Sequence, residues 1–62
     1  MNKLQEKRKE KGLSQSQLAE DSGVNKRMIQ YYEQGFKDIR KAQVETVYKL
    51  AHTLGCLIED II

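Results

Sequence analysis

Proline and tryptophan are absent from this chain of 62 residues, and cysteine and histidine each occur once. Because a disulfide needs two thiols, Cys56 cannot cross-link the fold, and with His52 it falls short of the four ligands that a structural metal site uses. We therefore expect neither a metal ion nor a cofactor. Long apolar runs are missing too. The longest stretch without a charged residue, 50–58, has nine residues, whereas a membrane helix needs roughly 18, so we expect no membrane partner.

The length of the chain allows one small hydrophobic core but not two, and we assign residues 1–62 to a single domain. A balance of 39% hydrophobic and 32% charged residues is typical of a folded, soluble protein. Charges from Lys3 onward leave no room for the apolar segment of a secretory signal. Since paired cysteines are also lacking, we expect a cytoplasmic protein.

Charge is distributed unevenly along the sequence. Residues 1–42 contain ten Lys and Arg against six Asp and Glu, whereas residues 43–62 contain one Lys against three acidic residues. A basic first part and an acidic end indicate one surface that meets a polyanion and another that is kept away from it. The alternative interpretation of such charges is an ordinary solvated surface.

Helices are the only regular elements that the sequence predicts. Four glycines fall at spacings that suit helix ends: Gly12, Gly23, Gly35 and Gly55. We expect helices at residues 2–11, 15–21, 26–34 and 44–54, with one or two further turns within 57–62. No stretch alternates as a strand would, and the fold class is therefore all-α.

Two helix starts carry capping residues. Ser14 and Gln17 have the spacing of a capping box, and Asn25 is a good N-cap for the third helix. The loop 35–42 is expected to turn Phe36 and Ile39 inward. The fourth helix has the clearest apolar period, formed by Val44, Val47, Tyr48, Leu50, Ala51 and Leu54. Beyond it, three residues are expected to pack back onto the core, namely Ile58, Ile61 and Ile62.

The second and third helices have the features of a helix-turn-helix. Ala19 is small enough for a close crossing, Gly23 suits the turn, and Ile29 and Tyr32 share the face that would hold the third helix on the core. An ordinary helical hairpin can show the same spacings by chance, so this pattern alone leaves both interpretations open.

Four motifs extend the pattern over most of the chain: GLSQSQLA at 12–19, SGV at 22–24, IQYYEQG at 29–35 and LAHTLG at 50–55. With them the chain resembles the Xre-type helix-turn-helix family of Cro-like and lambda-repressor-like DNA-binding domains. The resemblance implies a five-helix domain whose third helix, residues 26–34, enters the major groove of double-stranded DNA.

The resemblance also implies roles for individual residues. Gln15 would donate to a phosphate at the start of the second helix. Asn25, Lys26 and Arg27 would open the recognition helix, with Arg27 suited to guanine, and Gln30 and Tyr31 would meet adenine or a thymine methyl group. The loop would hold the DNA backbone through Lys37, Arg40 and Lys41. Arg8 and Glu33 would form an internal ion pair between the first and third helices.

These features predict a sequence-specific transcriptional regulator, most simply a repressor. The alternative is a protein-interaction module that keeps the fold without the DNA site, such as an antitoxin. No acid–base pair, phosphate loop or nucleophile with an adjacent base is present, so we expect no enzymatic activity.

A weak homodimer on a palindromic operator is the expected assembly, because one small domain contacts few base pairs and two half-sites lie about 34 Å apart. Leu57 stands where the family usually has a small polar cap. With Ile61 and Ile62 it forms the candidate dimer surface. The alternative is that Leu57 folds over the chain's own core.

Overall fold

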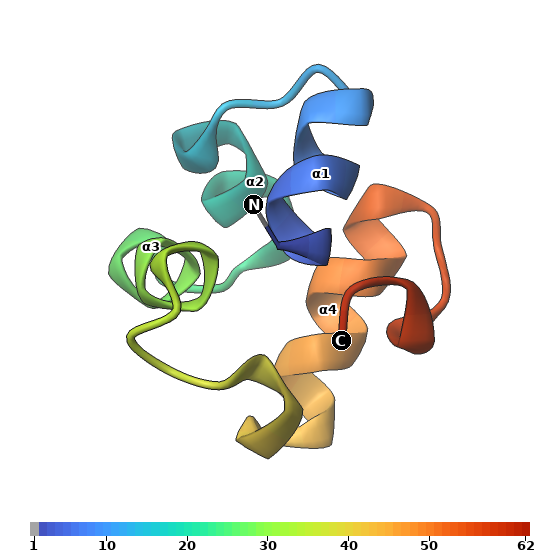
Figure 1. The fold of residues 1–62 in the computed structure, drawn as a ribbon. Helices are drawn as coiled ribbons and strands as arrows, with labels where there is room; N and C mark the ends of the chain where they lie inside the picture. The colour runs from blue at the N-terminus through green and yellow to red at the C-terminus, as the bar shows by residue number, and fades with distance from the viewer. Residues whose placement is uncertain (1) are drawn as a thin grey trace.

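The computed structural model describes residues 2–62 as four α-helices and two 3-10 turns (Figure 1). The elements in chain order are α1 (Lys3–Glu10), α2 (Gln15–Ser22), α3 (Lys26–Gln34), η1 (Ile39–Lys41), α4 (Val44–Leu54) and η2 (Ile58–Asp60). No strand occurs in this part of the chain. In Figure 1, α2 and α3 lie to the left of α1, η2 lies to its lower right, and the C-terminus is drawn below α1, over α4.

The helices start and stop where local sequence chemistry predicts. Asn2 begins α1 by accepting a hydrogen bond from the backbone of Gln5 at 2.9 Å, and Asn25 accepts one from the backbone of Arg27 at 2.7 Å. The capping box of α2 is formed, with both bonds between Ser14 and Gln17 in place. Each of these bonds gives a partner to a backbone donor that the helix itself leaves free.

The core is shared by all four helices and by the residue that follows η2. Its buried apolar side chains are Leu4, Leu18, Val24, Ile29, Tyr32, Val47, Leu50, Ala51, Leu54 and Ile61. Ile29 and Tyr32 hold α3 on this core as predicted, and Gly23 ends α2 at φ 77°, a left-handed value that glycine adopts without a Cβ penalty. The pair α2 and α3 therefore forms the predicted helix-turn-helix.

The all-α fold class is confirmed, but the predicted fifth helix is a single 3-10 turn. Within η2 the backbone bonds span three residues, from Asp60 to Leu57 at 2.9 Å and from Ile61 to Ile58 at 3.1 Å. This tighter winding turns Ile61 into the core, where only 2% of it is exposed. Ile62 does not pack back as expected, since it is 40% exposed.

Phe36, which was predicted to turn inward, is on the surface, as are two residues of the predicted apolar period of the fourth helix, Val44 and Tyr48. Phe36 is 74% exposed, Val44 75% and Tyr48 55%. On α4 the core takes one narrow face, formed by Val47, Leu50, Ala51 and Leu54, and the other two apolar residues of the helix fall outside it. The backbone N–H of Phe36 donates to the carbonyl of Tyr31 where α3 ends, and the Phe36 ring packs against the half-buried Tyr31 ring instead of the core. Ile39 does pack against the core, as predicted.

The two faces of α4 predict effects of different size when a side chain is truncated: a large loss of stability on the buried face and almost none on the exposed face. Leu50→Ala should lower the free energy of unfolding by about 2 to 5 kcal/mol, because it opens a cavity in the core. Val44→Ala, on the exposed side of the same helix, should change it by no more than about 0.5 kcal/mol. Urea denaturation followed by circular dichroism measures both, and equal losses would contradict this assignment of faces.

Candidate nucleic-acid interface

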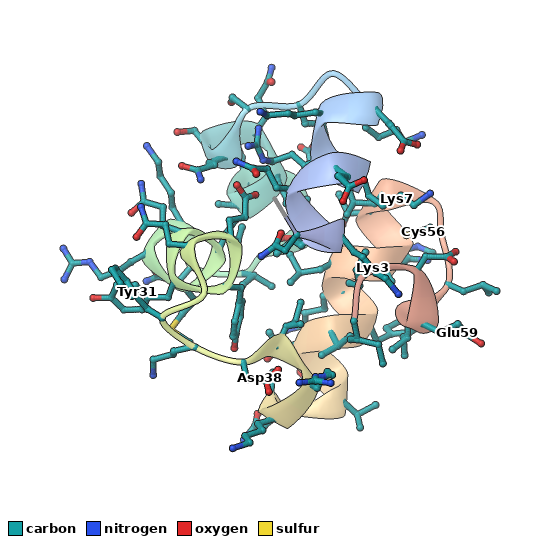
Figure 2. The ribbon with its side chains drawn as sticks, viewed as in Figure 1. Lys3, Lys7, Tyr31, Asp38, Cys56 and Glu59 are labelled. Carbon is teal, nitrogen blue, oxygen red and sulfur yellow. The ribbon has the colours of Figure 1, made fainter. Side chains whose placement is uncertain are left out.

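The α3 helix has an inner face and an outer face of different chemistry. Ile29, Tyr32 and Glu33 are buried, whereas Lys26 and Arg27 are exposed and Gln30 and Tyr31 are half-buried. A surface hollow in front of the first turn is lined by Asn25, Lys26, Arg27 and Gln30. Figure 2 shows Tyr31 on the outer side of α3, away from α1 and α4. The residues that the resemblance placed at the start of the recognition helix thus share one accessible surface.

A buried ion pair fixes α3 against α1. Arg8 donates from Nε to Glu33 Oε2 at 2.7 Å and from Nη2 to Glu33 Oε1 at 3.0 Å, and both residues are at most 9% exposed. The remaining Arg8 nitrogen, Nη1, donates to the carbonyl of Leu13 at 2.8 Å. Charged groups this deep are costly unless hydrogen-bonded. Here the bonds join α1, α3 and the segment that leads into α2.

The ion pair continues into a chain of two glutamines. Gln15 donates from Nε2 to Glu33 Oε1 at 3.0 Å, and Gln30 donates from Nε2 to Gln15 Oε1 at 3.4 Å. A carboxylate only accepts, so Glu33 requires the amide nitrogen of Gln15 to face it. The Gln15 oxygen then faces Gln30 and accepts from it. The amide of Gln30 is oriented by a charge that lies inside the protein.

The loop after α3 carries three exposed cations, Lys37, Arg40 and Lys41. Arg40 has a local partner: its Nε lies 3.2 Å from Asp38 Oδ1. Hydrogen bonds from the side chain and backbone of Arg40 lower the pKa of the Asp38 carboxyl, and the same side-chain bond raises the pKa of Arg40. Neither lysine takes part in an ion pair among residues 2–62. The two lysines are therefore the freer cations of this loop.

One exposed side chain at this surface was missed from the sequence. Phe36 contacts Tyr31 edge to face, with ring centroids 6.1 Å apart and an angle of 63° between the planes. The signal in the sequence is its position directly after Gly35, which ends α3 in a left-handed conformation, because an apolar residue there often contacts the last turn of the helix, here Tyr31. Periodicity carries no information in such a short irregular segment.

A second surface lies on α4 and η2, and we call it the α4 patch: Val44, Tyr48 and Leu57. Leu57 is 64% exposed, and Tyr48 stacks on His52 with ring centroids 5.6 Å apart. Cys56 is half-buried beside it, and burial raises the pKa of its thiol. The predicted dimer surface is wrong in one member, since Ile61 is in the core.

Comparison with known proteins identifies the class to which this fold and surface belong. A family model described as helix-turn-helix, of the Xre and Cro-like type, matches residues 4–61. The chain belongs to this family of DNA-binding transcription regulators. No curated protein and no solved structure matches the chain. None of the helices described here has the length and apolar character that a membrane crossing requires.

The buried ion pair predicts a large loss of stability when one charge is removed. Glu33→Gln leaves the guanidinium of Arg8 buried without its counter-charge, which should cost about 3 to 5 kcal/mol. Lys7→Gln is the matched control, because Lys7 pairs with Glu10 at 3.7 Å on the surface of α1, the helix that carries Arg8. This substitution should change stability by less than about 1 kcal/mol. Urea denaturation compares the two, and a Glu33→Gln loss no larger than the control's would show that the pair is not needed.

Proposed function

We propose that this chain is a sequence-specific transcriptional regulator, most simply a repressor, that binds double-stranded DNA with α3 in the major groove. Its membership of a DNA-binding family supports the class of protein, a DNA-binding transcription regulator. The outer face of α3, with its exposed cations and oriented amide, supports the mode of binding. Repression is the simplest outcome because a protein that occupies a promoter blocks other proteins from it.

The observation that carries the proposal is the hydrogen bond that orients the amide of Gln30, at 3.4 Å from Nε2 to Gln15 Oε1. One of its amide hydrogens points to Gln15, which leaves its carbonyl oxygen and second amide hydrogen for a ligand. Adenine presents the complementary pair in the major groove, a donor at N6 and an acceptor at N7. A glutamine held in one orientation therefore favours adenine, and it loses less side-chain entropy on binding than a free one.

Arg27 supplies the second proposed base contact. It is exposed in the first turn of α3, and the guanidinium fork matches the O6 and N7 acceptors of guanine. Asn25 and Lys26 lie beside it around the same hollow. Asn25 already caps α3, so its proposed contact to DNA uses the amide nitrogen, while Lys26 is suited to a phosphate or a base edge.

The remaining proposed contacts are to phosphates. Lys37 and Lys41 supply unpaired charge, and Arg40 would exchange its bond to Asp38 for one to the backbone. Gln15 keeps one amide hydrogen after its bond to Glu33, which suffices for a single phosphate oxygen. In this arrangement Gln15 links the DNA backbone to Gln30 and so couples the position of the protein to base recognition.

A weak homodimer on a palindromic operator completes the proposal. One domain covers few base pairs, and a symmetric pair doubles the contact. The surface proposed for the pair keeps Leu57 and Ile62 from the predicted surface, leaves out the buried Ile61, and adds Val44 and Tyr48 of the α4 patch. Figure 2 places Cys56 and Glu59, which adjoin Leu57, on the side of the molecule away from Tyr31, so a dimer formed there leaves α3 accessible.

The second candidate function is a protein-interaction module, such as an antitoxin, and the α4 patch is the observation that favours it. Three exposed apolar side chains offer a site for a different protein as well as for a second copy. The two functions differ in what the cations of α3 do. If Lys26→Ala together with Arg27→Ala leaves nucleic-acid binding unchanged while a protein partner still co-purifies, this candidate replaces the first.

Selection of bound DNA from random sequence tests the proposed function directly. We expect one enriched motif that contains adenine and guanine, and an affinity that falls steeply with salt because phosphate contacts release counterions. Arg27→Ala should relax the preference at one position by about 1 to 3 kcal/mol, whereas Lys41→Ala should weaken all sequences alike. Recovery of no enriched sequence would refute sequence-specific binding.

The dimer is tested by sedimentation with and without a palindromic site. Leu57→Ser should shift the protein toward monomer and lower its affinity for the palindrome more than for a half-site. Phe36→Ser, which alters an even more exposed apolar residue on another part of the surface, should leave association in the absence of DNA unchanged. A Leu57→Ser protein that sediments as the wild type does would exclude this surface.

A further inference from the structure

Phe36 is the exposed aromatic residue for which the contacts described so far give no role. It is 74% exposed and yet held in place. Its backbone N–H donates to the carbonyl of Tyr31 at 2.9 Å, and the N–H of Lys37 donates to the same oxygen at 3.3 Å. With its ring against that of Tyr31, the side chain has a fixed support rather than the freedom of a loop tip.

The surroundings of this aromatic pair are basic and continue the outer face of α3. Arg27 lies four residues before Tyr31, so the two side chains are neighbours on one helix face. Lys37 follows Phe36 directly and is exposed. An apolar pair between two cations suits a ligand that presents anionic groups with an apolar group between them. Double-stranded DNA does so where a thymine methyl group projects into the major groove between the phosphate backbones.

We propose that Phe36, supported by Tyr31, is a specificity-determining residue that packs on the C5-methyl group of a thymine at the edge of the site. This inference rests on the proposed function and adds to it a base contact made from outside α3. Tyr31 lies about 6 Å further along the helix axis than Arg27. With base steps of about 3.4 Å, a thymine at the level of Tyr31 lies about two base pairs from the base that Arg27 contacts.

The contact is tested by removing the methyl group from the DNA. Each thymine of the selected site is replaced in turn by deoxyuridine, which keeps every hydrogen-bonding group and lacks only the methyl. We expect one position per half-site at which uracil weakens wild-type binding by about three- to ten-fold, the size of one well-packed apolar contact. Phe36→Ala should bind thymine and uracil equally at that position and be weaker than wild type only on thymine.

Two matched variants separate this effect from others. Lys37→Ala removes a neighbouring charge, so it should weaken binding to both bases equally and reduce the salt dependence. Tyr48→Ala removes an exposed aromatic ring from the α4 patch and should leave the thymine-to-uracil ratio unchanged. Because Phe36 is outside the core, its alanine variant should show the thermal unfolding temperature of the wild type, which circular dichroism checks.

The outcomes distinguish this inference from the proposed function. A wild-type protein that selects no sequence would overturn both. A wild-type protein that selects a sequence, but loses nothing with uracil at any position, would overturn this inference alone. The same holds if Phe36→Ala keeps the wild-type ratio of thymine to uracil affinity. If it does so while weakening both sites equally, the ring contacts sugar and phosphate rather than the methyl group.

Discussion

The bond between Arg8 and Glu33 is the interaction on which the rest of the structure depends. It crosses from α1 to α3 in a protein whose first helix has one buried apolar anchor, Leu4. Without the pair, α1 would be held on α3 mainly by that leucine and by the bond from Asn2 to the carbonyl of Tyr32. The same carboxylate is also the acceptor that orients Gln15. One buried charge thus sets both the position of a helix and the direction of an amide on the outer surface.

A buried ion pair is a costly way to join two helices, because desolvation consumes much of the attraction between the charges. Two apolar residues of similar volume would join α1 and α3 at least as firmly. They would not, however, accept the hydrogen bond from Gln15, and Gln30 would then have no fixed partner. The pair therefore contributes orientation as well as cohesion. No other buried residue of the described chain supplies a carboxylate for the bond from Gln15, because the rest of the core is built from aliphatic side chains and one tyrosine.

Features that depend on neighbouring residues were predictable from the sequence, and features that depend on tertiary packing were less so. The capping box at Ser14 and the end of α2 at Gly23 follow from local hydrogen bonding and backbone freedom. The exposure of Tyr48 does not, since an apolar period shows only that a helix has an apolar side, not how wide the core beneath it is. The resemblance to a family supplied the partners Arg8 and Glu33. The bond between Gln15 and Gln30 needed the crossing geometry of two helices.

Around η2, residues close in sequence divide between the core and the surface. Leu57 has no side-chain oxygen with which to cap η2, and Asp60 instead reaches back to accept from the Leu57 backbone at 3.0 Å. The Asp60 backbone N–H donates to the Leu57 carbonyl at 2.9 Å, and the tight turn brings Ile61 into the core while the Leu57 side chain lies outside it. The acidic residues of η2, Glu59 and Asp60, lie beside the exposed leucine. Lys3 and Lys7 line the same hollow as Glu59 and Asp60, so this surface carries charges of both signs. On α3, by contrast, the exposed charges are the cations Lys26 and Arg27, because Glu33 is buried.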